Sequence, residues 1–209
     1  MNLKDYEYYR TDLGVLYHGD CLEIIPMLEP VDLVLTDPPY GIGNFVQITG
    51  NLRGEKVTWN DNPPEKQIFD IIKTKSKHRI IWGANYFNCF ESGAIVWVKN
   101  QTLPNMSKAD LASCNFFKKV EIVEITWSGF NTTKESKHPC ERPISLYVWC
   151  INYAPNPQTI LDPFIGSGTT AIACERLNRR WIGIEIEERY CEIAAKRVEK
   201  ENQQLKLFN

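Results

Sequence analysis

The fold is decided by residues 159–171, which read TILDPFIGSGTTA. The first three residues are β-branched or aliphatic and predict a short strand, which the following Asp-Pro pair ends. A glycine-rich turn comes next, and the pattern beyond it predicts a helix from Ser167 to Asn178. A strand, a glycine-rich turn and a helix in direct succession are typical of an α/β protein with a parallel sheet.

The rest of the chain alternates in the same way. Segments rich in β-branched and aromatic residues predict six more strands, over residues 15–17, 31–36, 79–82, 94–98, 120–127 and 181–184. Further helices are predicted over residues 21–28, 64–75, 107–114, 143–153 and 187–204. No repeat or Pro/Gly-rich linker divides the chain. We therefore expect one α/β domain over residues 1–209, with helices on both faces of its sheet.

Composition places the chain among globular proteins. Its 209 residues are 43 % hydrophobic, with 24 Lys and Arg against 26 Asp and Glu, which suits one domain with a sizeable core. No apolar run approaches the roughly 18 residues that span a bilayer, and the N-terminal residues lack a secretory signal, so we expect a cytoplasmic protein. The seven cysteines form no Cys-x-x-Cys pair and the three histidines are scattered, so no disulfide framework or metal site is expected.

Charge is distributed unevenly along the chain. The formal net charge of -2 argues against a protein that holds nucleic acid by charge alone. Residues 1–40 carry 2 basic and 8 acidic side chains, whereas residues 41–140 carry 13 basic and 9 acidic ones. Candidates for phosphate contact in and beside this basic stretch are Lys73, Lys75, Lys77, Arg79, Lys134, Lys137 and Arg142. A solvated helix face is the alternative for the first four.

Asp37-Pro38-Pro39-Tyr40 comes directly after the predicted strand 31–36. Ligands of parallel sheets bind beyond the carboxyl ends of strands, so the tetrapeptide stands where a site is expected. The prolines fix the backbone and remove two N–H donors, which leaves carbonyl acceptors beside a carboxylate and an aromatic ring. Asp37 and the Pro38 carbonyl can hold the hydrogens of an exocyclic amine such as adenine N6 or cytosine N4, while Tyr40 stacks on the base. The alternative is a strand-ending turn with a solvated carboxylate.

The glycine-rich turn is the second candidate site. Gly166 and Gly168 allow a ligand to approach the backbone closely. Glu185 ends the next predicted strand, 19 positions after Gly166, where an acidic side chain can accept hydrogen bonds from both ribose hydroxyls of a nucleoside cofactor. The alternative is an ordinary helix N-terminus beside a surface glutamate.

The spacing of Gly166, Gly168 and Ala171 also satisfies the loose dinucleotide-binding pattern, so a nicotinamide-dependent dehydrogenase is the rival interpretation. A dinucleotide fold needs a second mononucleotide half, whereas the residues after Glu185 are enough for one helix. A mononucleoside cofactor therefore fits better. No Gly-x-x-x-x-Gly-Lys-[Ser/Thr] sequence occurs, so the turn is not the P-loop of a nucleoside triphosphatase.

Taken together, these residues resemble the S-adenosylmethionine-dependent DNA amino-methyltransferases, in the permuted beta group where Asp-Pro-Pro-Tyr precedes the cofactor loop. Gly19-Asp20-Cys21 resembles the acidic turn of that family near the cofactor adenine. Residues 138–143 resemble its His-Pro-x-x-Lys-Pro segment, with Arg142 in place of the lysine. Residues 79–87 and 109–112 are similar to segments of small phage and prophage adenine methyltransferases, which implies a bacterial or phage-encoded protein.

The resemblance implies a Rossmann-like methyltransferase fold with a mostly parallel seven-stranded sheet, S-adenosyl-L-methionine as cofactor, and direct in-line methyl transfer to a base flipped out of double-stranded DNA. The catalytic residues that it implies are Asp37, Pro38, Pro39 and Tyr40. The cofactor-binding residues that it implies are Asp20, Cys21, Asp37, Asp162, Pro163, Phe164, Gly166, Ser167, Gly168, Thr169 and Glu185.

The leading Asp37 favours N6 of adenine, because in this family Asp-Pro-Pro-Tyr usually accompanies adenine and Ser-Pro-Pro-Tyr cytosine N4. A cytosine-N4 enzyme is the alternative, and a catalytically silent DNA-binding relative is the lower one. Inserted loops at about residues 43–63, 100–107 and 129–141 are the candidate DNA-contacting regions of the single catalytic domain. The site-specific enzyme of a restriction-modification system is expected, as a monomer or homodimer without metal.

Overall fold

One sheet organises the chain. The computed structural model describes residues 2–41, 62–100, 107–126 and 142–207, and within them nine strands pair in the order β1-β2-β9-β8-β3-β4-β6-β5-β7. The strands are β1 (Glu7–Arg10), β2 (Gly14–His18), β3 (Val31–Thr36), β4 (Ser76–Trp82), β5 (Gly93–Val98), β6 (Ala109–Cys114), β7 (Val120–Glu124), β8 (Thr159–Asp162) and β9 (Arg180–Glu185). The helices are α1 (Cys21–Ile24), α2 (Lys66–Lys75), α3 (Ala84–Phe87), α4 (Ile144–Tyr153), α5 (Thr169–Leu177) and α6 (Glu188–Leu207), with short 3-10 turns at Leu3–Tyr6 and Ile25–Met27.

Seven of these strands run in one direction, namely β2, β9, β8, β3, β4, β5 and β7. They are the seven strands that the sequence predicts, so the mostly parallel sheet is confirmed. The expected total of seven strands is wrong for the described residues, because β1 and β6 join the sheet antiparallel to their neighbours. Strand β1 is four residues long and mostly exposed, and β6 consists largely of small and polar residues.

The predicted helix over residues 107–114 is also wrong, since Ala109–Cys114 forms strand β6. This strand lies between β4 and β5 and pairs with both, and its last three residues are buried. Hydrogen bonding on both edges stabilises an extended backbone whatever its small residues prefer in isolation. Asp110 lies on this strand, so the wrong prediction also misplaces that carboxylate.

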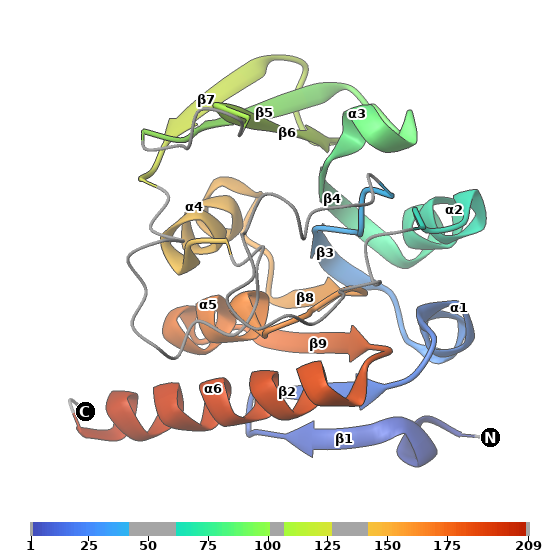
Figure 1. Ribbon diagram of the computed structural model, residues 1–209, viewed down its shortest axis with the longest axis vertical. Helices are drawn as coiled ribbons and strands as arrows, with labels where there is room; N and C mark the ends of the chain where they lie inside the picture. Colours follow the sequence, from blue (N-terminus) through green and yellow to red (C-terminus); the bar gives the residue numbers. More distant parts are fainter. Residues whose placement is uncertain (1, 42–61, 101–106, 127–141, 208–209) are drawn as a thin grey trace, which may run out of the picture.

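Alternating apolar residues give the sheet two cores, one on each face. Leu16, Leu33 and Leu35 belong to the core that contains residues of α4, α5 and α6. Their neighbours Val15 and Val34 belong to the other core, with α1 and α2. Figure 1 shows α4, α5 and α6 ranged along one side of the sheet and α1 and α2 apart from them. The predicted two-sided cover is therefore confirmed.

Helix α6 closes the first face. The sequence places Tyr190, Ile193, Ala194, Arg197 and Val198 on one helical face. Tyr190, Ala194 and Val198 are buried, and Ile193 and Arg197 are partly buried. The opposite face carries charged residues such as Glu192 and Lys196. Among the described helices, none combines the length and apolarity needed to cross a bilayer.

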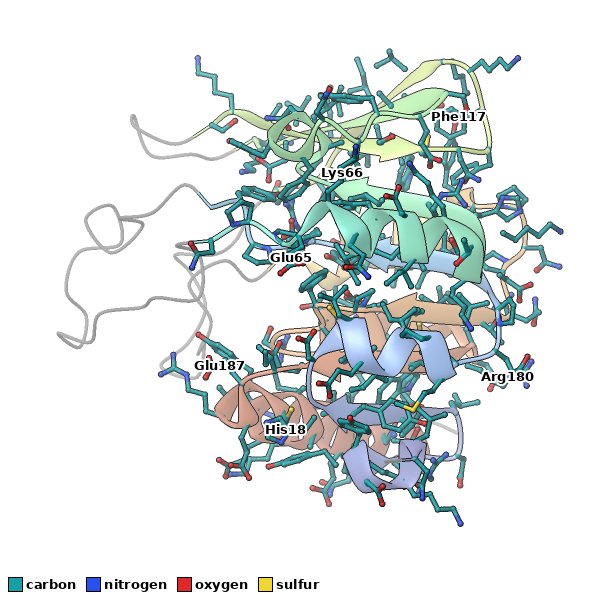
Figure 2. The ribbon with its side chains drawn as sticks, turned by 90° about the vertical axis from the view of Figure 1, so that its right-hand side faces the viewer. His18, Glu65, Lys66, Phe117, Arg180 and Glu187 are labelled. Atoms are coloured by element: carbon teal, nitrogen blue, oxygen red, sulfur yellow. The ribbon has the colours of Figure 1, made fainter. Side chains whose placement is uncertain are left out.

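The position of any site can be read from the strand order. Neighbouring strands β3 and β8 lead away in opposite directions, β3 through α2 to β4 and β8 through α5 to β9. Open α/β sheets bind ligands at such a divergence, beyond the carboxyl ends of the strands. Figure 2 distinguishes the two edges, with His18 and Glu187 near the carboxyl ends of β2 and β9 and Arg180 at the opposite edge. Both predicted motifs therefore leave the sheet side by side.

The two-core arrangement makes a stability prediction. Ile72 of α2 is fully buried, so Ile72→Ala should lower the free energy of unfolding by about 2–5 kcal/mol through lost apolar burial and a residual cavity. Ile122→Ala is the matched control, because this side chain on β7 is 61 % exposed, and its effect should stay within about 0.5 kcal/mol. Denaturant unfolding measures both. Equal losses would contradict the placement of α2.

Candidate active site

The carboxylate of Asp37 is held by three donors. Arg142 donates from Nε to Oδ2 at 2.5 Å and from Nη2 to Oδ1 at 2.9 Å. The hydroxyl of Tyr40 donates to Oδ1 at 2.7 Å. The side chain of Asp37 is 22 % exposed, so it lies at the surface of the carboxyl edge with its orientation fixed from below.

Arg142 is buried and paired rather than free to contact DNA. Its side chain is 7 % exposed, and Nη1 donates to Oδ2 of Asp110 at 2.8 Å. The guanidinium carbon lies 4.8 Å from the ring centre of Trp82 and 5.5 Å from that of Trp97. The prediction that Arg142 contacts phosphate is therefore wrong, because its donors face inward.

The charges around Arg142 alternate in sign. Lys99 lies 2.8 Å from the other oxygen of Asp110, so the row runs Lys99, Asp110, Arg142, Asp37. Burial by itself lowers the pKa of Arg142, but Asp37, Tyr40 and Asp110 raise that pKa well above its ordinary value. Burial raises the pKa of Asp110, and Arg142 and Lys99 outweigh it, so the pKa falls below the usual value. Both groups therefore stay ionised at neutral pH.

The ring of Tyr40 is fixed by packing. It stacks on Tyr86 with ring centres 4.6 Å apart and an interplanar angle of 17°, and Phe87 meets it edge-on at 6.0 Å. Gly83 has a φ of 72°, and a Cβ there would lie 2.2 Å from the Tyr40 ring, so this turn needs glycine. Burial raises the pKa of Tyr40 well above its usual value, which keeps the hydroxyl protonated as a donor. Tyr86 itself is 49 % exposed.

Asp162 joins the two motifs from beneath. Its Oδ1 accepts from Thr36 Oγ1 at 2.7 Å and from the backbone N–H of Phe164 at 3.1 Å, and its Oδ2 accepts from the hydroxyl of Thr170. Thr36 ends β3 and Thr170 lies in the first turn of α5. The carboxyl group is 2 % exposed, and burial raises its pKa to about 7. Its contacts link β3, its own loop and α5.

The glycine-rich turn connects to Glu185 through backbone hydrogen bonds. Gly166, with a φ of 52°, donates its N–H to Oε2 of Glu185 at 2.9 Å, and Glu187 donates its N–H to Oε1 at 2.9 Å. Each carboxylate oxygen can accept a further hydrogen bond. Burial raises the pKa of Glu185 above its usual value, and the two backbone donors oppose that shift. The arrangement fits an acceptor for a diol such as ribose.

Two predicted cofactor residues face α6 instead of open space. A Cβ on Gly168 would lie 3.0 Å from the Cβ of Ala194, so glycine is needed there for helix packing. Ser167 accepts hydrogen bonds from Arg197 at both its carbonyl and its hydroxyl oxygen. The packing of α6 against this turn therefore explains why Ser167 and Gly168 occur in the motif.

The acidic turn lies beside Glu185. Gly19 donates its N–H to the carbonyl oxygen of Glu185 at 2.9 Å, and Asp20 caps α1 by accepting from the N–H of Leu22. Burial raises the pKa of the Cys21 thiol to about 12, so it is no nucleophile. The remaining predicted cofactor residues lie in the loop and at the start of α5, with Phe164 partly buried and Pro163 and Thr169 buried.

The first basic cluster does not lie at this edge. Lys73 and Lys75 end α2 and Lys77 is the second residue of β4, at the amino edge of the sheet. Arg79 lies mid-strand, and its guanidinium turns back to the carbonyl of Ser76 at the same edge. Lys75 donates to the carbonyls of Pro26 and Leu28, and Arg79 pairs with Glu91 at 2.8 Å. Lys134, Lys137 and residues 138–141 lie outside the described residues, as do most of the three candidate DNA-contacting loops.

The sequence motifs did not single out Lys99, Asp110, Trp82 or Trp97 as site residues. Both motifs occupy the turns directly after strands, whereas Trp82, Trp97 and Asp110 lie within strands β4, β5 and β6. Two signals were available: the resemblance of residues 79–87 and 109–112 to family segments, which include Trp82 and Asp110, and Arg142 in place of lysine, since a buried guanidinium requires carboxylate partners. Within the described residues, no group of three or more His, Cys, Asp or Glu side chains has the geometry of a metal site.

Comparison with known proteins finds DNA methyltransferases. A family model described as "DNA methylase" matches residues 117–196. The chain is 27 % identical to Type II methyltransferase M2.DpnII of Streptococcus pneumoniae, over 94 % of this chain and 93 % of that protein. It is 25 % identical to the putative methylase YubD of Escherichia coli, over 82 % and 84 % of the two chains.

Solved structures share the fold. The M1.HpyAVI-SAM complex superposes with a TM-score of 0.63 at 24 % identity, covering 88 % of this chain and 100 % of that one. The cytosine-N4-specific PvuII DNA methyltransferase superposes with a TM-score of 0.64 at 18 % identity, covering 95 % and 93 %. The fold is the Rossmann-like fold of the DNA methyltransferases. By sequence the chain is similar to DNA methyltransferases.

The buried Asp162 predicts a pH dependence. Its pKa of about 7 exceeds the ordinary unfolded value of roughly 3.9, so the folded state binds the proton more tightly. That contribution to stability is present below about pH 4 and is lost as pH rises through about 7. Relative to wild type, Asp162→Asn should therefore gain a few kcal/mol, roughly 4 at most, between pH 4 and 7.

Chemical unfolding across this pH range measures the difference. Asp70→Asn is the control, because Asp70 is an exposed aspartate on α2 and its curve should parallel that of wild type. A constant difference between wild type and Asp162→Asn at all pH values would contradict the assignment.

Proposed function

We propose that this protein transfers a methyl group from S-adenosylmethionine to the exocyclic N6 amine of adenine in double-stranded DNA. The observation that carries the proposal is the placement of Asp37-Pro38-Pro39-Tyr40 beside the glycine-rich turn, where β3 and β8 diverge. The likeness to Type II DNA methyltransferases and to a structure solved with S-adenosylmethionine supports it.

The chemistry asks two things of the Asp-Pro-Pro-Tyr segment. Bound S-adenosylmethionine supplies an electrophilic methyl group on a sulfonium sulfur. Asp37 and the carbonyl of Pro38 accept the two amine hydrogens, which orients the nitrogen lone pair for a direct in-line transfer. The carboxylate also stabilises the positive charge that develops on nitrogen, until the nitrogen releases one of its protons to solvent. No covalent enzyme intermediate is needed, and Tyr40, fixed by Tyr86, provides a ring surface for the base.

The cofactor side of the site consists of Glu185 and the two turns beside it. Glu185 accepts the ribose hydroxyls with the acceptor capacity that Gly166 and Glu187 leave free. Asp20, whose turn is hydrogen-bonded to Glu185 through Gly19, would hold the adenine. Asp162 acts from beneath by holding the glycine-rich loop to the end of β3.

Cytosine N4 is the second candidate substrate. It is favoured by the superposition on the cytosine-N4-specific PvuII enzyme, which covers 95 % of this chain. An amine held by a carboxylate and a carbonyl has the same geometry on either base, so the Asp37 contacts do not select between them. A silent DNA-binding relative is the third candidate, and product analysis separates all three.

The identity of the product tests the proposal. Duplex DNA of varied sequence is incubated with labelled S-adenosylmethionine, digested to nucleosides and analysed by mass spectrometry. N6-methyladenine is the expected product, and N4-methylcytosine would move the assignment to cytosine. If wild-type protein binds S-adenosylmethionine but modifies no base, the silent relative is the correct interpretation.

Removal of the carboxylate tests the role of Asp37. Asp37→Ala should abolish methyl transfer, because the amine loses its charged acceptor. Loss of the ion partner of the buried Arg142 should also lower stability by about 3–5 kcal/mol, so circular dichroism and S-adenosylmethionine binding must show that the variant is folded. Asp70→Ala on the exposed face of α2 is the control and should keep wild-type activity. Normal turnover by Asp37→Ala would sink the assignment.

The cofactor assignment has its own test. Glu185→Gln should weaken S-adenosylmethionine binding roughly 10- to 100-fold, since hydrogen bonds to a charged acceptor contribute about 1.5–3 kcal/mol. The exposed neighbour Glu188 provides the matched control, Glu188→Gln. Isothermal titration measures both dissociation constants, and an unchanged value for Glu185→Gln would remove Glu185 from the site.

A further inference from the structure

We propose that Arg142, held by Asp110, is a positioning residue that presents the Asp37 carboxylate to the substrate amine. The inference rests on the proposed function and extends it to residues on β6 and before α4. Its basis is the pattern of donors around Asp37, in which two of the three come from the one guanidinium.

We call the paired contact of Arg142 Nε and Nη2 with the two oxygens of Asp37 the fork. A count of lone pairs shows which acceptor position of Asp37 stays unoccupied. A carboxylate accepts about four hydrogen bonds, two at each oxygen. In Asp37, Oδ1 receives Arg142 Nη2 and the Tyr40 hydroxyl, and Oδ2 receives Arg142 Nε. Within the described residues, one acceptor position therefore remains, on Oδ2. A single free acceptor on a fixed oxygen suits one N–H of an exocyclic amine, while the other goes to the Pro38 carbonyl.

The guanidinium of Arg142 can orient the Asp37 carboxylate because its own orientation is fixed. Its third nitrogen is tied to Asp110, whose other oxygen is held by Lys99 at 2.8 Å. Trp82 and Trp97 lie against the guanidinium, and both rings are almost fully buried. Asp110 thus sets the plane of the fork, and the fork sets the plane of the Asp37 carboxylate.

The balance of charges also indicates that Asp110 supports the contact of Arg142 with Asp37. Two cations and two anions alternate along the row, so Asp37 is matched by Arg142 and Asp110 by Lys99. A buried guanidinium with only Asp37 as partner would leave one nitrogen without an acceptor, at a cost of about 1–3 kcal/mol. The second carboxylate is therefore a requirement of the fork rather than an independent surface pair.

Arg142→Lys is the decisive variant. An ammonium keeps the charge but is a point donor that cannot bridge both oxygens of Asp37 and also reach Asp110. We expect kcat to fall roughly 10- to 100-fold, as small misplacements of catalytic groups do, with the dissociation constant for S-adenosylmethionine within about twofold of wild type. Asp110→Asn should lower kcat by a smaller factor, because it keeps a neutral acceptor for Arg142.

The chain offers a matched control in Arg79. This arginine forms a comparable fork on Glu91, with side chains 11 % and 18 % exposed, at the amino edge of the sheet. Arg79→Lys makes the same chemical change in a similar environment. Its kcat should stay within about twofold of wild type, even if its melting temperature falls as much as that of Arg142→Lys. A loss in Arg142→Lys that Arg79→Lys does not share is specific to the site.

The outcomes are separable. Wild-type kcat in Arg142→Lys, or an equal loss in Arg79→Lys, overturns the positioning role and leaves the proposed function standing. If Arg142→Lys does not fold, Asp110→Asn decides, since unchanged kcat in that variant also overturns the role. If wild-type protein transfers no methyl group to DNA, the proposed function fails first and the inference falls with it.

Discussion

The hydrogen bonds of the buried Asp162 carboxylate hold the site together. They join Thr36, at the end of β3, to Thr170, in the first turn of α5, and thereby fix the two segments that leave the sheet where the strand order diverges. Asp37 is the residue after Thr36, and Gly166 precedes Thr170 by four positions. Any displacement of one motif relative to the other must break this contact, which has no access to water.

Above that junction the site is built from ionic groups over aromatic rings. Burying paired charges is costly unless every donor and acceptor is satisfied, so such a row is weak evidence for stability alone. Lys99, Asp110, Arg142 and Asp37 are each paired with an opposite charge, one acceptor of the partly exposed Asp37 stays open, and Trp82 and Trp97 lie against the guanidinium. In sequence, Tyr40, Lys99 and Arg142 also stand beside the three segments that we expect to contact DNA. The fixed orientation of the Asp37 carboxylate is what the protein gains in return for the cost of removing these charges from water.

Much of the fold could be predicted from the sequence, for identifiable reasons. The seven parallel strands are rich in β-branched, aliphatic and aromatic residues, and β3 and β8 end at the turn signals Asp37-Pro38 and Asp162-Pro163. Strand β6 could not be predicted, because Ala109–Cys114 is small and mixed in polarity and becomes a strand only by pairing on both edges. Strand β1 is short and exposed at the sheet edge.

The site residues also fall into two groups, those that local motifs predict and those that only the folded sheet brings together. Asp37, Glu185 and the glycine-rich turn were predictable because local motifs place them at strand ends. Asp110 reaches Arg142 across 32 positions of sequence and Arg142 reaches Asp37 across 105, so only the folded sheet brings them together. The same distance in sequence explains why Arg142, a lone cation next to a proline, resembled a phosphate contact.

The most direct test of the central claim is a crystal structure of the protein with sinefungin, which carries an amine in place of the methylated sulfonium. The account predicts that the ribose is held by Glu185 and that the amine points to the Asp37–Tyr40 segment, with Arg142 still forked on Asp37. A nucleoside bound away from Glu185, or an amine directed away from Asp37, would contradict it.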